Sequence, residues 1–150
     1  MQAIERVAKA RPAGADFWKI AHGRNNMSEL ERINSIKSGL SVDIAYAAKN
    51  TFQMSSQNLV ALLNLSAATF ERRRRDAKPL DPAASERLDR IVSIALQAEE
   101  VFEDKQAAAK WMSEPNRALA GNTPLMHCET AIGAQQVRRI LNALEWGGVA

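Results

Sequence analysis

The sequence is poor in aromatic residues and contains a single cysteine. Aromatic residues make up 5% of its 150 positions and hydrophobic residues 46%, so a core would consist mainly of Ala, Leu, Ile and Val. Such a core suits packed helices better than sheets, which favour β-branched and aromatic side chains. Because Cys128 has no partner cysteine in the chain, an internal disulfide is impossible, and we expect a reducing, cytoplasmic setting.

Long hydrophobic runs are also missing. No segment approaches the roughly 18 apolar residues of a membrane span, and the first residues contain no apolar run of signal-peptide length. Only seven glycines and five prolines interrupt the chain, and several of them mark segment boundaries. We therefore predict an all-α protein without a membrane-spanning segment.

No pattern in the chain has the character of an active site or a metal site. His127 and Cys128 are adjacent, and His22 is the only other histidine, which leaves too few ligands for a closed tetrahedral site. The acidic pairs at 99–100 and 103–104 have neither a nucleophile nor a base partner, and they are typical of solvated helix faces. We therefore predict that the protein is not an enzyme and has no catalytic residues, no metal and no cofactor.

The net charge of +3 conceals an uneven distribution. Residues 1–27 carry five Lys or Arg against two Asp or Glu, a net of +3, and residues 28–80 carry eight against five, again +3. Residues 81–150 carry seven against ten, a net of −3. A basic front suits a polyanion and an acidic back suits a different partner, so the distribution predicts two binding functions.

The first helix signal comes late in the chain. Residues 1–27 are expected to form either a loosely docked arm or a disordered tail, because a proline and a glycine interrupt any early helix. A capping box at Ser28 and Glu31 then predicts a helix that ends at Gly39. Its apolar residues follow at helical spacing, at Leu30, Ile33 and Ile36. A second helix is predicted from Ser41.

Residues 55–75, SSQNLVALLNLSAATFERRRR, have the layout of a DNA-reading helix-turn-helix. The first helix has an inward stripe of leucines and ends at Asn64, one of the few residues besides glycine that tolerate positive φ. Ser66 caps the second helix, and Phe70 anchors that helix in the core. Residues 28–80 are therefore predicted to be a DNA-binding lobe of the Cro/repressor-like helical type.

Helical geometry separates the four consecutive arginines, since successive residues rotate by about 100°. Arg72 and Arg75 should point away from the core, while Arg73 and Arg74 turn toward the sides, where Arg74 could pair with an acid. We predict that base edges lie nearest Ala68, Thr69 and Arg72, and that phosphates lie nearest Ser66, Arg73 and Arg75. The alternative is a solvated basic helix end that interacts favourably with the helix dipole.

The back of the chain, residues 81–150, is predicted to be a small second helical domain. A long helix begins at Asp81 with Pro82 at its favoured first position. Asp104 and Thr130 are predicted to cap further helices, with a Pro-, Gly- and Asn-bearing connection before the last one. The last helix has an apolar face formed by Val137, Ile140, Leu141 and Leu144.

A series of spaced motifs over roughly residues 39–148 resembles the MbcA/ParS/Xre antitoxin family, the Xre-type antitoxins of RES–Xre toxin–antitoxin systems. The most specific motifs are Leu65-Ser66-X-X-Thr69-X-X-Arg72-Arg73-Arg74, Leu80-Asp81-Pro82 and Ala98-X-X-Val101-Phe102. Further matches are Trp111, Pro115-Asn116, Leu119, Gly121, Pro124-Leu125, Thr130-X-X-Gly133 and Glu145-X-Gly147. The chain departs from the family pattern at Asn64, where glycine is usual, at Met126-His127-Cys128, and at Trp146.

The resemblance implies that the front lobe binds the promoter of its own operon and that the back domain binds a toxin. The usual partner is a RES-domain toxin that consumes NAD or transfers ADP-ribose from it, and the C-terminal part of the antitoxin covers the entrance to the toxin's active site. We accordingly predict toxin contacts at Arg138, Asn142, Glu145, Trp146, Gly147, Gly148, Val149 and Ala150. For Trp146 the alternative is ordinary packing on the lobe around Trp111.

A homodimer is expected, because helix-turn-helix proteins usually read paired half-sites, and it would form a hetero-oligomer with the toxin. Two other functions stay open at this point. One is a stand-alone dimeric regulator without a toxin partner. The other is a protein-interaction domain that has lost DNA binding.

Overall fold

The computed structural model describes residues 17–147, and within that range the chain forms helices and no strands. The expected all-α fold is therefore confirmed. In chain order the elements are α2 (Phe17–Asn25), α3 (Glu29–Ser38), α4 (Val42–Thr51), α5 (Ser56–Leu63), α6 (Ala67–Arg75), α7 (Pro82–Phe102), α8 (Lys105–Ser113), the short 3-10 helix η2 (Arg117–Leu119), α9 (Pro124–His127) and α10 (Ala131–Glu145).

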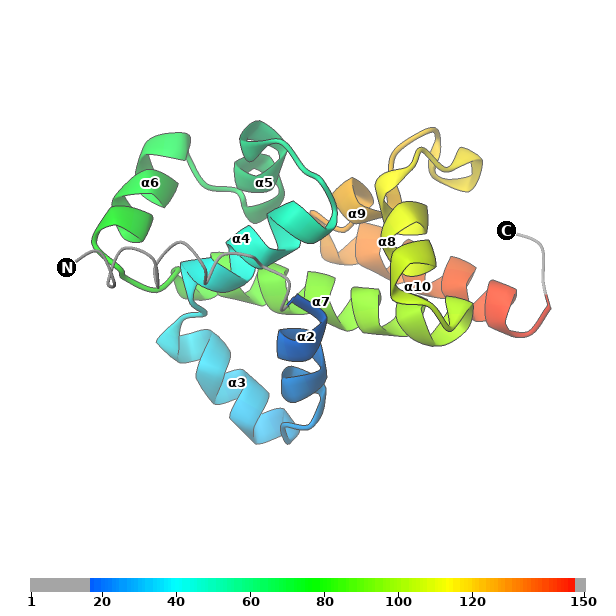
Figure 1. Cartoon of the computed structure of the whole chain (residues 1–150), viewed down its shortest axis with the longest axis horizontal. Helices are drawn as coiled ribbons and strands as arrows, with labels where there is room; N and C mark the ends of the chain where they lie inside the picture. The colour runs from blue at the N-terminus through cyan, green and yellow to red at the C-terminus, as the bar shows by residue number, and fades with distance from the viewer. Residues whose placement is uncertain (1–16, 148–150) are drawn as a thin grey trace, which may run out of the picture.

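The long helix α7 runs along the middle of the molecule's long axis and is shared by its two halves (Figure 1). It packs against α2, α3 and α5 of the front half and against α8 and α10 of the back half. Because α7 has neighbours on several sides, its buried apolar residues lie on more than one face of the helix: Ala84, Leu88, Ile91, Val92, Ile94, Ala95 and Ala98. The two halves therefore share one core, which extends along α7.

Polar N-caps begin each of the helices α3 to α10. Their side chains accept hydrogen bonds from otherwise unpaired N–H groups in the first turn, and each cap contributes about 1 kcal/mol. The caps are Ser28, Ser41, Ser55, Ser66, Asp81, Asp104, Thr123 and Thr130. The capping box predicted at Ser28 and Glu31 is present in full.

Helix α2 corrects the expectation of a loosely docked arm or disordered tail for residues 1–27, of which those before 17 lie outside the described residues. Phe17 is completely buried, and its ring meets the rings of Trp18 and Phe52 edge-on with centroids 5.2 Å apart. Edge-to-face packing of this kind is a favoured aromatic arrangement. The contact with Phe52 joins α2 to a distant segment of the chain, and the sequence of α2 alone does not show it.

A buried ion cluster fastens α2 and α3 to α7. Asp89 of α7 accepts hydrogen bonds from Arg24 of α2 at 2.7 Å and from Arg32 of α3 at 2.6 Å. The side chains of Asp89 and Arg24 are each 8% exposed. Burial alone would raise the pKa of Asp89, but the hydrogen bonds from Arg32 and Arg24 outweigh it and hold that pKa below its ordinary value.

Helix α3 forms where its apolar spacing predicts it, but its stripe does not enter the core. Leu30 and Ile33 are 67% and 47% exposed, and α3 has no buried residue. Apolar burial therefore does little to hold α3 on α7, and the ion pair of Arg32 with Asp89 contributes to its docking instead.

A close backbone crossing fixes the loop after α6. The Leu80 N–H donates to the Leu40 carbonyl at 2.9 Å, and the Leu40 N–H donates to the buried Ser85 hydroxyl at 2.7 Å. Gly39 has φ +98°, and a Cβ there would lie 2.3 Å from the Leu80 carbonyl oxygen. Only glycine fits both the conformation and the space, so this crossing holds α6 in place relative to α7.

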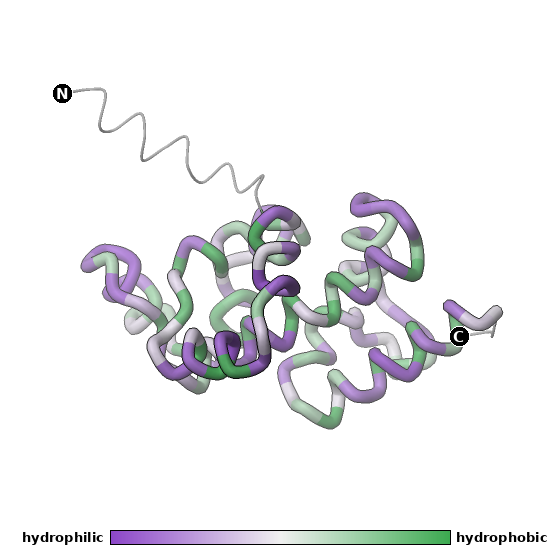
Figure 2. The backbone as a smooth tube through the Cα atoms, turned by 90° about the horizontal axis from the view of Figure 1, so that it is seen from below, coloured by the Kyte–Doolittle hydropathy of each residue, from purple (hydrophilic) through white to green (hydrophobic). Residues whose placement is uncertain are grey.

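Hydrophobic and hydrophilic residues alternate along the helices, as Figure 2 shows. Within residues 17–147, no helix is long and apolar enough to span a membrane.

Candidate functional site

The helix-turn-helix has the turn geometry that its sequence predicts. Asn64 ends α5 in the left-handed conformation, with φ 58° and ψ 46°. Ser66 then caps α6: its hydroxyl accepts a hydrogen bond from the Thr69 N–H at 3.0 Å and donates one to the Thr69 hydroxyl at 2.9 Å. Phe70 is 4% exposed and anchors α6 in the core.

The structure divides the four arginines of α6 into two pairs. Arg73 donates to the Pro79 carbonyl at 2.8 Å, and Arg74 pairs with Glu71 at 3.3 Å, as predicted for Arg74. Arg72 and Arg75 are exposed; Arg75 lies 3.5 Å from the neighbouring Asp76. No hydrogen bond or ion pair with another described residue engages Arg72. The outward face of α6 thus presents Ala68, Arg72 and Arg75 to solvent.

Tyr46 of α4 is a supporting residue that the sequence did not reveal. Its ring lies 5.5 Å from the ring of Phe70, and the Arg74 guanidinium lies 5.1 Å above it. Burial raises the pKa of Tyr46, although the charge of Arg74 opposes this shift. Tyr46 lies outside the helix-turn-helix sequence, and α4 and α6 come together only in the folded protein. No pattern within the helix-turn-helix therefore indicates this contact.

The second candidate surface is the C-terminal end of α10. Val137 and Leu141 are buried, as the apolar face predicted, and Ile140 and Leu144 are half-buried. Trp146 is 84% exposed. The alternative of packing on the lobe around Trp111 is therefore contradicted.

The residues predicted to contact a partner here have different surroundings. Arg138 donates to the Ser93 hydroxyl at 3.2 Å, and Asn142 accepts a hydrogen bond from Gln97 at 3.0 Å, so both help to hold α10 on α7. Glu145 is exposed. Gly147 is the last described residue and has φ +81°, while the predicted contacts at residues 148–150 lie outside the described range.

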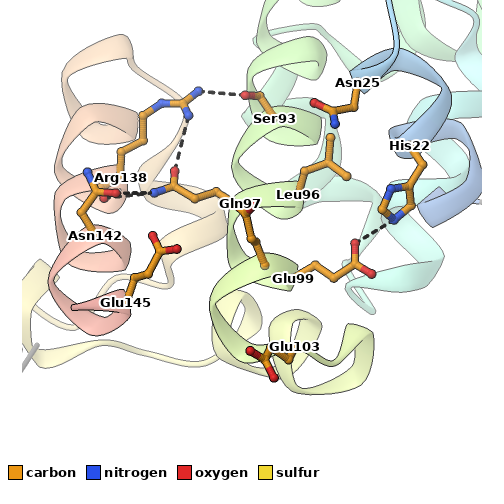
Figure 3. Close-up of a pocket in the computed structure, with 11 residues that line it drawn as sticks. His22, Asn25, Ser93, Leu96, Gln97, Glu99, Glu103, Arg138, Asn142 and Glu145 are labelled. Atoms are coloured by element: carbon orange, nitrogen blue, oxygen red, sulfur yellow. Dashed lines mark hydrogen bonds and ion pairs between the residues drawn. The ribbon is translucent and has the colours of Figure 1, made fainter. Parts of the chain in front are cut away.

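An open groove of about 830 Å³ lies between α2, α7 and α10, and we call it the acidic groove. Figure 3 shows side chains from all three helices directed toward it, with α10 on one side and α2 on the other. It is lined by His22, Asn25, Ser93, Leu96, Gln97, Glu99, Glu100, Glu103, Arg138, Asn142 and Glu145. His22 pairs with Glu99 at 2.8 Å across the α2 side.

The acidic pairs of α7 lie on a solvated helix face, as the sequence predicts, since Glu100, Glu103 and Asp104 are exposed. The sequence does not show that this face also forms part of a groove. Glu99, Glu100 and Glu103 line a concave surface whose other walls come from helices distant in sequence. The helical spacing of these acids was visible, but the positions of α2 and α10 were not.

The adjacent His127 and Cys128 have structural partners. The Cys128 thiol is buried and donates to the Pro124 carbonyl at 3.2 Å, while the His127 ring hydrogen-bonds the Gln136 side chain. Burial raises the pKa of Cys128 to about 12, against the opposing charges of Arg138 and Arg90. No group of three or more potential metal ligands occurs among the side chains that the structure describes.

The fold and these surfaces define a helix-turn-helix protein whose C-terminal helices pack on the same long helix, α7. Comparison with known families agrees with this. Residues 31–93 match the antitoxin Xre-like helix-turn-helix domain, and residues 97–147 match the antitoxin Xre/MbcA/ParS C-terminal toxin-binding domain. The chain belongs to the Xre/MbcA/ParS antitoxin family. The first match ends and the second begins within α7, and the division at residues 80–81 stays a prediction.

Individual proteins that are similar in sequence to this chain belong to the same family. A protein named Antitoxin Xre from Yersinia enterocolitica serotype O:8 / biotype 1B is 30% identical over 116 residues, which are 77% of this chain and 78% of that protein. Another of that name, from Pseudomonas putida, is 36% identical over 64 residues, 43% of this chain and 40% of that protein. A protein named Prs ADP-ribosylating antitoxin from Sphingobium sp. is 24% identical over 132 residues, 82% of this chain and 83% of that protein.

Proposed function

We propose that this antitoxin neutralises a RES-domain toxin that consumes NAD or transfers ADP-ribose from it, by covering the entrance to the toxin's active site. The observation that carries the proposal is Trp146, which is 84% exposed where α10 ends. A large exposed aromatic residue is a typical anchor of a protein interface. The name of the Sphingobium relative, which contains the words Prs ADP-ribosylating, supports the same chemistry for the partner.

The contact surface that we propose for the toxin consists of Arg138, Asn142, Glu145, Trp146 and residues 147–150. The protein would act by binding and not by catalysis. Since Arg138 and Asn142 also hold α10 on α7, their replacement would disturb the surface indirectly. Trp146 and the residues after it are therefore the sharper test of toxin contact.

We also propose that α6 binds the promoter of the antitoxin's own operon and represses transcription. Ala68, Arg72 and Arg75 project outward, and residues 28–80 carry a net charge of +3. Ser66 and Thr69 lie at the N-terminal end of α6, where free N–H groups favour a phosphate. Arg73 would contribute chiefly by holding α6 to the loop at Pro79, with phosphate contact as a second role.

The two proposed surfaces lie at opposite ends of the molecule: Figure 1 shows α6 near one end of the long axis and the end of α10 near the other. This separation supports the proposal that one chain holds DNA and toxin at the same time. We propose a homodimer on DNA, because helix-turn-helix proteins usually read paired half-sites. Both partners would place the protein in the cytoplasm.

Co-expression with the product of the adjacent gene tests this function. We expect the two proteins to copurify and the full chain to rescue growth that the partner alone arrests. An electrophoretic shift with the operon promoter tests the second role. A chain that shifts the promoter but neither binds nor neutralises the partner would instead be a stand-alone regulator.

A further inference from the structure

The acidic groove carries more negative charge than its surroundings neutralise. Four carboxylates line it, those of Glu99, Glu100, Glu103 and Glu145, against one arginine. That arginine, Arg138, directs its guanidinium to Ser93 and Gln97 on α7 (Figure 3). Glu99 pairs with His22, whereas no ion pair within residues 17–147 engages the other three carboxylates. A concave surface with one sign of charge concentrates the field and attracts the opposite charge.

A second, independent observation is that part of this groove belongs to the matched toxin-binding region. Its α10 wall and the C-terminal part of its α7 wall lie within residues 97–147, which match a toxin-binding domain. The wall formed by α10 ends at Glu145, directly before the exposed Trp146. A partner anchored on Trp146 would therefore extend along the groove.

The expected chemistry of the toxin supplies the complementary charge. A protein that binds NAD must hold the two negative charges of a pyrophosphate, and it does so with arginine, lysine or helix N-termini. We expect the approach to such a site to be positively charged as well. An antitoxin that covers the approach would gain by presenting carboxylates to it.

We propose that the acidic groove receives a basic segment of the toxin, with His22 and Asn25 of α2 forming its far wall. This inference rests on the proposed function. It extends the toxin-binding surface to a helix that precedes both matched regions, which begin at residue 31. The docking of α2 by Asp89 and Arg24 then has a functional consequence, because it places that wall.

A pair of charge reversals with a matched control tests the groove. The variant Glu100→Lys/Glu103→Lys changes two exposed groove residues, and Glu114→Lys/Glu129→Lys makes the same change in charge at two exposed positions outside the groove. The probe is the purified product of the adjacent gene, and the measurement is Kd by calorimetry. We expect the groove variant to weaken binding about tenfold or more at low salt, and the control by no more than about twofold.

Salt dependence and a single substitution on α2 provide two further readouts. Binding of the unmodified chain should weaken between about 50 and 300 mM salt, and the groove variant should show a smaller salt dependence. Asn25→Asp adds a carboxylate to the far wall and should tighten binding, whereas Asn25→Lys should weaken it. The milder Glu100→Gln/Glu103→Gln variant should lie between the unmodified chain and the double lysine variant.

The binding measurements distinguish an error in the groove proposal from an error in the proposed function. If the unmodified chain binds the toxin while the groove variant binds within about twofold of it, the groove proposal is overturned and toxin neutralisation stands. If the unmodified chain does not bind, the proposed function is wrong and the inference falls with it. Equal weakening by the groove and control variants would show a general charge effect, and it would also overturn the groove proposal.

Discussion

The substitution Asp89→Asn tests whether the buried ion cluster docks α2 and α3 on α7. Asn has nearly the shape of Asp, so the change creates no cavity, but it removes the negative charge that faces Arg24 and Arg32. Arg24 is 8% exposed, so its guanidinium has little contact with water, and its other hydrogen bond goes to the Ser35 hydroxyl at 3.0 Å. Arg32 is 38% exposed and can turn to solvent. The expected cost therefore comes mainly from Arg24.

Breaking a buried ion pair by removing one partner costs about 3–5 kcal/mol. The amide oxygen of Asn can still accept one hydrogen bond from Arg24, so we expect the lower end, about 3 kcal/mol. For a chain of this length that corresponds to a fall of about 6–12 °C in Tm. The control Glu86→Gln removes an exposed acid from the same helix and should cost less than about 1 kcal/mol.

The free energy of unfolding is measured by urea titration with circular dichroism. Because the folded pKa of Asp89 is lowered, its contribution is present above the unfolded pKa, about 3.9, and is lost as the pH falls through the folded pKa. The difference between the two proteins should thus stay constant from pH 7 to pH 5 and shrink below about pH 4. A loss of less than about 1 kcal/mol at pH 7 would refute the reasoning, because it would mean that Arg24 finds water or another partner.

Three further experiments test other parts of the structure. Gly133→Ala should destabilise the protein by about 2–3 kcal/mol in the same urea assay, because a Cβ there would lie 1.9 Å from the His127 carbonyl oxygen. Unchanged stability would contradict this packing of α10 on α9. Arg72→Ala should weaken promoter binding by about 1–3 kcal/mol and relax its specificity, and Arg75→Ala should weaken binding to all DNA and lower the salt slope by about one. Both variants are measured by mobility shift over a salt series. If neither substitution has an effect, α6 is not the recognition helix. The Cys128 thiol should resist a disulfide reagent at pH 8 in the folded protein and react after unfolding, since burial raises its pKa to about 12; fast reaction in the folded protein would contradict that burial.

The features predictable from sequence were those that depend on neighbours in the chain. A cap needs only its own side chain and the first turn of its helix, so Ser66, Asp104 and Thr130 were identifiable from the sequence. Asn64 was identifiable for the same reason, because the turn after α5 requires a left-handed residue. The outward direction of Arg72 followed from helical rotation alone.

The features missed from sequence depend on contacts between distant segments. Helix α2 is held by Phe52 and Asp89, which lie 27 or more positions beyond it in the chain, so its own residues gave no periodic signal. Arg73 is held by a backbone carbonyl, which no side-chain pattern identifies. The acidic residues of α7 became a groove only when α10 and α2 were placed beside them.

The central claim, that the end of α10 neutralises a toxin, is tested most directly by measuring how fast the purified toxin consumes NAD in the presence of this protein. The product of the adjacent gene is the toxin that we propose for this assay, and the full chain is compared with a chain that ends at Glu145. The full chain should abolish NAD consumption at equimolar concentration, and the shortened chain, still folded by circular dichroism, should leave most of it. Equal inhibition by the two chains would contradict the claim.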